Sequence, residues 1–154
     1  MTTQTAAPTV DENFAAALAH VTSEVTRTDS KAAALLTLDG LLVAGIGLLG
    51  TKAPWWSLVL GAIGGVAIAG SVVMALLVIR PRLARAEGVT PNGSFLHFAS
   101  TTPSALAAHM TVDYRADRIT SLSRICLTKM RFLRRSGDLA LVAVLAVAAA
   151  LLTR

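Results

Sequence analysis

The hydrophobic positions of this chain form three nearly uninterrupted apolar stretches. Residues 32–50 and 54–79 follow one another almost directly, and residues 139–152 form a third, shorter stretch. An α-helix rises about 1.5 Å per residue, so about 20 apolar residues cross a hydrocarbon core of roughly 30 Å. The pattern therefore predicts an all-α membrane protein whose first two transmembrane helices, about 32–50 and 55–79, form a hairpin.

The third apolar stretch is short for a span, but an arginine flanks it on each side. A helix from Arg135 to Arg154 is about 28 Å long, and both guanidinium groups can reach opposite interfaces on their flexible side chains. We predict a third transmembrane helix at the C-terminus, about 136–153. The alternative is a re-entrant or interfacial helix.

Amphipathic patterns outside the apolar stretches predict further helices. Apolar residues before the first span recur at spacings of three and four: Phe14, Leu18, Val21 and Val25. No Gly or Pro follows them before Gly40, so this helix should continue into the membrane. Residues 1–10 have no periodicity and are predicted to be a disordered tail, with 11–154 as a single membrane domain.

A second amphipathic pattern precedes the third span. Its apolar stripe is Ile119, Leu122, Cys126, Met130 and Leu133, and basic residues occupy much of the rest. Thr102 followed by Pro103 is typical of a helix start, so we expect a long helix after it.

Lysine and arginine are unevenly distributed along the chain. Residues 80–138 contain ten of them, whereas the turn between the first two spans contains only Lys52 and the C-terminus only Arg154. Because positive residues stay on the cytoplasmic side, we expect a basic cytoplasmic segment over 80–135 in a multi-pass protein of the cell (inner) membrane. The N-terminus would be cytoplasmic and the C-terminus outside, with no cleaved signal peptide.

Composition agrees with this interpretation and limits the possible functions. Charged residues make up 15% of the chain, below the roughly 25% of soluble domains, as expected for a chain dissolved in lipid. Topology accounts for the positive charge and no base-stacking aromatics accompany it, so we expect no nucleic-acid partner. His20, His97 and His109 are far apart and Cys126 is the single cysteine, which predicts no metal site. No catalytic motif is present and the serines and threonines suit helix caps, so we expect no enzyme and no cofactor.

Asp39 is the most unusual residue, because it lies eight positions into the first span. A carboxylate deep in a membrane helix costs about 2.5–3.5 kcal/mol on insertion scales. It is therefore a candidate for a gating group or an inter-helix hydrogen bond, or else a carboxyl group close to the interface. Gly61, Gly65 and Ala69 recur every four residues in the second span, which predicts either a close packing seam or merely a glycine-rich helix.

The basic helix offers candidate ligand-binding residues: Arg118, Arg124, Lys129, Arg131 and Arg134, with Arg135 beside them. Clustered basic side chains can bind the phosphate of a small anionic molecule. The alternative is that they lie against anionic lipid headgroups.

Three segments together resemble a known family. They are TDSKA at 28–32 running into Asp39, the aromatic segment SFLHFAS at 94–100, and LSRI at 122–125 followed by Lys129 and Leu133-Arg134-Arg135. Their combination resembles the Pycsar effector transmembrane family over most of the chain after about residue 14. Within it, Asp29 and Lys31 belong to the motif that precedes the first span.

The resemblance implies an antiphage role. Members of this family are paired with a pyrimidine cyclase, whose cyclic CMP or cyclic UMP activates the effector to impair membrane integrity and cause abortive infection. The chain has no recognisable separate nucleotide-binding domain, so a directly acting messenger would bind the cytoplasmic helices or the 88–104 loop. A homo-oligomer in the lipid bilayer is expected. The alternative is a small multi-pass accessory or scaffold subunit without pore activity.

Overall fold

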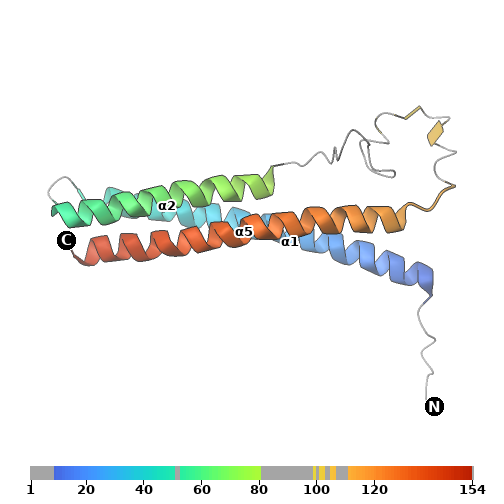
Figure 1. Ribbon diagram of the computed structural model, residues 1–154, viewed down its shortest axis with the longest axis horizontal. Helices are drawn as coiled ribbons and strands as arrows, with labels where there is room; N and C mark the ends of the chain where they lie inside the picture. Colours follow the sequence, from blue (N-terminus) through green and yellow to red (C-terminus); the bar gives the residue numbers. More distant parts are fainter. Residues whose placement is uncertain are drawn as a thin grey trace, which may run out of the picture. The chain divides into compact units, whose positions relative to one another are not determined.

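Three long helices dominate the computed structural model. Helix α1 spans Val10–Gly47, α2 spans Trp55–Ile79 and α5 spans Arg115–Leu152 (Figure 1). Each is long enough and apolar enough to cross a membrane. The expected all-helical fold with three spanning helices is therefore confirmed. The structure describes residues 9–50, 53–80, 99, 101–102, 105–106 and 111–153.

Helix α1 begins at a capping box. The backbone N–H of Thr9 donates to Glu12 Oε2 at 2.7 Å, and the N–H of Glu12 donates to Thr9 Oγ1 at 3.3 Å. These two bonds satisfy backbone donors that a helix start leaves free, and they hold the pKa of the Glu12 carboxyl below its usual range. The helix then continues without interruption to Gly47, as the absence of Gly and Pro before Gly40 predicts.

The turn between α1 and α2 uses residues suited to helix ends. Gly50 has a φ of 67°, a left-handed conformation that side chains with a Cβ adopt rarely. Pro54 directly precedes the first helical residue of α2, where its missing N–H and fixed φ cost little. Lys52 lies outside the described residues.

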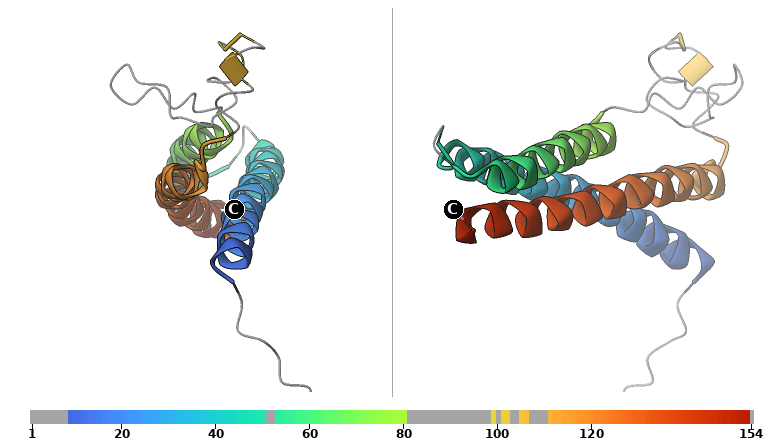
Figure 2. Two further views of the ribbon diagram at one scale, coloured as in Figure 1. Left: turned by 90° about the vertical axis from the view of Figure 1, so that its right-hand side faces the viewer. Right: turned by 60° about the vertical axis from the view of Figure 1, so that its left-hand side comes forward.

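The described chain divides into two compact units. One, here the two-helix unit, contains 9–25 with the start of α1, the short described pieces 99, 101–102 and 105–106, and 111–126 with the start of α5. The other, here the three-helix unit, contains 26–80 and 127–153, in which the three helices lie side by side (Figure 1, Figure 2).

Small residues fill the interior of the three-helix unit. The buried residues of α2 are Ser57, Gly61, Gly64, Ala67, Ile68, Ser71, Ala75 and Val78. Those of α5 are Lys129, Ser136, Ala140, Ala143, Ala146, Val147 and Ala150. Large apolar side chains such as Leu41, Val66 and Leu145 point outward instead. This arrangement is typical of helices that associate in lipid, where close backbone approach rather than burial of large side chains holds them together.

The predicted long helix after Thr102 is not continuous. The N–H of Leu106 donates to the carbonyl of Thr102 at 2.9 Å, but residues 111–114 are non-helical and α5 begins only at Arg115. Asp113 accounts for this break, because its Oδ1 accepts the backbone N–H of Arg115 at 3.0 Å in competition with a helical bond. Several predictions fall outside the described residues: the disordered tail over residues 1–8, most of the 88–104 loop, Pro103, His97, His109 and Arg154.

Candidate functional site

A buried polar contact joins all three helices of the three-helix unit. Asp39 of α1 is only 1% exposed, and its Oδ2 accepts a hydrogen bond from Ser71 Oγ of α2 at 2.8 Å. Ser71 Oγ also lies 3.1 Å from Ser136 Oγ of α5, and Ser136 Oγ lies 3.0 Å from the Ser71 carbonyl oxygen. A single serine of α2 therefore connects the carboxyl group of α1 to α5.

The bonding of Asp39 is incomplete within the described part of the chain. A hydroxyl group carries one proton, and the bond from Ser71 to Asp39 is shorter than the 3.1 Å approach of Ser71 Oγ to the Ser136 carbonyl oxygen. Asp39 Oδ1 is the one buried side-chain oxygen or nitrogen among the described residues without a hydrogen-bond partner. An unsatisfied buried polar atom costs about 1–3 kcal/mol, so burial of Asp39 between the three helices lowers the stability of their packing.

Of the placements that the sequence allowed for Asp39, the structure has the inter-helix hydrogen bond. Its side chain is buried in a seam between helices instead of lying exposed toward lipid or headgroups.

A second polar contact joins α1 to α5. Lys129 Nζ lies 2.6 Å from Asp29 Oδ1, with 8% of the lysine side chain and 39% of the aspartate side chain exposed. Beside it, Thr28 Oγ1 donates to Met130 Sδ at 3.7 Å. The structure thus brings together one predicted ligand-binding residue, Lys129, and one family-motif residue, Asp29.

The other predicted basic residues lie on the surface. Arg118 and Arg124 are exposed in the two-helix unit, whereas Arg131 and Arg134 are exposed in the three-helix unit. Lys31, the second motif residue, is also exposed. Lys129 therefore differs from its predicted companions in being buried, and its ammonium group is paired with the carboxylate of Asp29.

The predicted glycine stripe lies only partly inside the three-helix unit. Gly61 is buried, and a Cβ added to it would lie 2.7 Å from Leu49 Cδ1. Gly65 is partly buried and would meet only Ile46 at 3.9 Å, while Ala69 is exposed. The tightest approach to α5 is instead at Gly64, where an added Cβ would lie 2.9 Å from Val147 Cγ2.

Sequence reasoning missed the serines that connect helices. Besides Ser71 and Ser136, Ser57 at the start of α2 donates to the carbonyl of Ala150 at 2.7 Å, near the end of α5. The sequence favoured helix capping for such residues, because single hydroxyl groups carry no signal of a partner some 90 residues away. Only their spacing along the buried face of α2 could have indicated their role.

In the two-helix unit, Arg115 is the main polar link. It pairs with Asp113 at 2.9 Å and with Asp11 of α1 at 2.6 Å, and its guanidinium lies 5.6 Å from the centroid of the Phe14 ring. Hydrogen bonds from Arg115 hold the pKa of Asp113 below its usual range, and the two carboxylates raise the pKa of Arg115.

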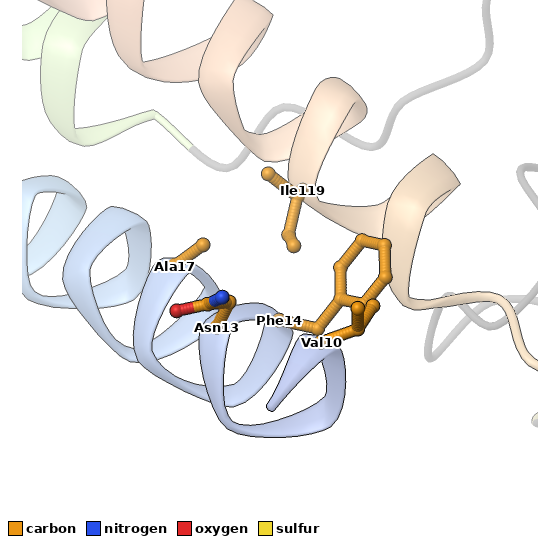
Figure 3. A pocket seen from close by; sticks show the side chains of 5 residues that line it. All are labelled: Val10, Asn13, Phe14, Ala17 and Ile119. Carbon is orange, nitrogen blue, oxygen red and sulfur yellow. The ribbon is translucent and has the colours of Figure 1, made fainter. Parts of the chain in front are cut away.

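An open apolar pocket of about 310 Å³ lies in the same unit. Figure 3 shows Phe14 and Ile119 on opposite walls, one from each helix. Its remaining lining residues are Val10, Asn13 and Ala17. With an almost entirely apolar lining, the pocket has few groups that could hold a polar ligand.

Comparison with known protein families gave a match over nearly the whole chain. A family model described as the Pycsar effector protein domain matches residues 13–154, which include nearly all of α1 and the whole of α2 and α5. No curated protein and no solved structure matched the chain.

Proposed function

The chain belongs to the Pycsar effector family, and from this premise we propose that it is the membrane-damaging component of a two-gene antiphage system. A cyclic pyrimidine nucleotide, cyclic CMP or cyclic UMP, made by a partner cyclase would activate it. Activation would impair membrane integrity and kill the infected cell before the phage multiplies. The observation that carries this proposal is the family match across nearly the whole of a chain with three membrane-length helices.

The interior of the three-helix unit suits a conditional loss of membrane integrity. Hydrogen bonds between membrane helices contribute about 0.6 kcal/mol on average, so contacts such as that of Asp39 with Ser71 are individually weak. A ligand that binds one packing of the helices better than another can therefore shift the equilibrium between them. Separation of α1, α2 and α5 at these contacts would expose Asp39, Ser71 and Ser136 and create a polar surface inside the bilayer.

The exposed arginines are the proposed contacts for the cyclic phosphate. Arg118, Arg124, Arg131 and Arg134 lie on α5, and guanidinium groups bind phosphate oxygens through two parallel N–H donors. These residues would face the cytoplasm, where the messenger is made, if the N-terminus is inside and the C-terminus outside. Assembly into a homo-oligomer would let several chains contribute to one path.

The experiment is to measure membrane potential in cells that express the chain with a pyrimidine cyclase. We expect depolarisation only when both are present. Arg124→Ala should raise the messenger concentration needed by about tenfold, because a charge-assisted bond to phosphate is lost. Arg80→Ala, which removes an exposed arginine from the end of α2, is the matched control and should behave as the wild type. A membrane that stays polarised, together with co-purification of a second protein, would instead indicate an accessory or scaffold subunit.

A further inference from the structure

Lys129 is the one buried cationic side chain in the described part of the chain, and its partner is unusually accessible. The ammonium group lies 2.6 Å from Asp29 Oδ1. Only 8% of the Lys129 side chain is exposed, compared with 39% of that of Asp29. The cation is thus held inside the three-helix unit while its counter-charge lies partly at the surface of that unit.

This asymmetry determines which partner can leave. A buried lysine without a counter-charge is strongly unfavourable, so Lys129 has to remain paired. Asp29 is partly exposed and precedes the predicted first span, so its carboxylate loses little when it moves fully into water. Any species that replaces Asp29 must therefore be an anion, and exchange of one anion for another costs less than opening the pair.

The surrounding charge favours an incoming anion. The segments 26–31 and 127–138 together contain six basic residues, Arg27, Lys31, Lys129, Arg131, Arg134 and Arg135, against two acidic residues, Asp29 and Asp138. This local excess attracts anions and raises their concentration near the pair. Phosphate suits such a site, because its several oxygens can accept from a lysine and an arginine together.

We propose that Lys129 forms an anion-binding site which Asp29 occupies in the resting chain, and that a phosphate-bearing ligand acts by displacing Asp29. This inference rests on the proposed function and makes it more specific, since Asp29 then acts as an internal competitor of the activating ligand. The ligand class is a phosphate monoester or diester anion, either a free nucleotide or a lipid headgroup.

Displacement of Asp29 would remove the ion pair between α1 and α5. One neighbouring contact between the two helices, that of Thr28 with Met130, is a 3.7 Å bond to a thioether sulfur and is weak. Helix α1 would then be freer to move along α5. Such a movement would also disturb the contact of Asp39 with Ser71. In this view the ion pair between Asp29 and Lys129 holds α1 against α5 until an anion replaces Asp29, and we call this ion pair the latch.

The test uses the full-length chain in phosphatidylcholine vesicles loaded with a fluorescent dye. Asp29→Asn should leak about tenfold faster than the wild type with nothing added, because the latch is missing. Asp138→Asn removes another carboxylate from the same basic region, is exposed, and should leak as slowly as the wild type. Asp29→Asn as tight as the wild type would overturn the proposal.

Exchange of the two residues separates a latch from a merely structural contact. Asp29→Lys combined with Lys129→Asp restores the ion pair, so basal leakage should return to the wild-type level. The exchanged chain should not respond to cyclic CMP, cyclic UMP or inorganic phosphate, because it presents a carboxylate to the anion. A response equal to that of the wild type would contradict the proposal. If the exchanged chain does not fold, Lys129→Met gives the alternative test: it should leak without ligand and show no increase with it.

The arms of the experiment also identify the source of the anion. Leakage of the wild type on addition of a cyclic nucleotide indicates a soluble ligand, and leakage induced by phosphatidylglycerol in the vesicles indicates a headgroup. If Asp29→Asn leaks but the wild type responds to neither cyclic nucleotide, the role of the Asp29–Lys129 ion pair is supported and activation by a nucleotide is rejected. If Asp29→Asn does not leak but the wild type responds to a cyclic nucleotide, only the proposed role of the Asp29–Lys129 ion pair is rejected.

Discussion

The two-helix unit and the three-helix unit use opposite chemistry, although α1 and α5 contribute to both. In the two-helix unit, large apolar side chains such as Phe14 and Ile119 face each other, and the ion pairs of Arg115 lie at the surface. In the three-helix unit, glycine, alanine and serine form the interior, and the polar contacts are buried. The same helix therefore changes its mode of packing along its length.

The difference follows from the solvent to which each kind of surface is suited. Water favours burial of large apolar side chains and weakens exposed ion pairs. Lipid provides no such driving force, so close backbone approach and hydrogen bonds between helices become the main attractive terms. The three-helix unit should consequently be sensitive to side-chain volume, and the two-helix unit to salt and pH.

The largest effect is expected from a side chain added where α2 approaches α5 most closely. Gly64→Leu would place a Cβ 2.9 Å from Val147 Cγ2 and should destabilise the chain by about 1–3 kcal/mol or more. The matched control is Gly40→Leu, where no atom lies within 4 Å of the added Cβ. Thermal unfolding in detergent measures both, and equal losses of stability would show that volume is not what limits this unit.

A smaller effect is expected from the buried serines. Ser71→Ala removes the donor to Asp39 and should destabilise the three-helix unit by about 1–2 kcal/mol, because the carboxyl group is left without that bond. Ser136→Ala shares the same network, so the double variant should lose less stability than the two single variants added together. Strict additivity would show that Ser71 and Ser136 act independently.

The smallest effect is expected at Arg115. Arg115→Gln should loosen the start of α5, measured as faster amide exchange, and the difference from the wild type should shrink in 1 M salt. Because the pKa of Asp113 is lowered, its ion pair with Arg115 contributes fully to stability above the usual carboxyl pKa range. This contribution is lost as the pH falls through the lowered pKa. A variant whose exchange differs equally at all salt concentrations would imply a packing role instead.

The three spanning helices could be predicted from the sequence because the hydropathy of a segment does not depend on which helices pack against it. The continuity of α1 into the first span was likewise predictable, since no Gly or Pro occurs before Gly40. The break before Arg115 was missed because the Asp113 side chain competes with a helical bond through local geometry that an apolar stripe does not indicate.

The candidate site was predictable in part. Asp39 was identified because a carboxyl group inside an apolar stretch is conspicuous, but its partner Ser71 was not, since a serine in a membrane helix is common. Lys129 was grouped with the arginines because of its charge alone. Its burial depends on Asp29, a hundred residues earlier in the chain, and charge patterning along one helix carries no information about such a pairing.

The close contact of Gly64 with Val147 limits what can pass between α2 and α5. Where an added carbon would already collide with a methyl group, the seam is too narrow at that level for a file of water molecules. Water and ions could pass between α2 and α5 at that level only if the two helices first separate. On the proposed function, a chain in this arrangement would leave the surrounding membrane sealed until it is activated.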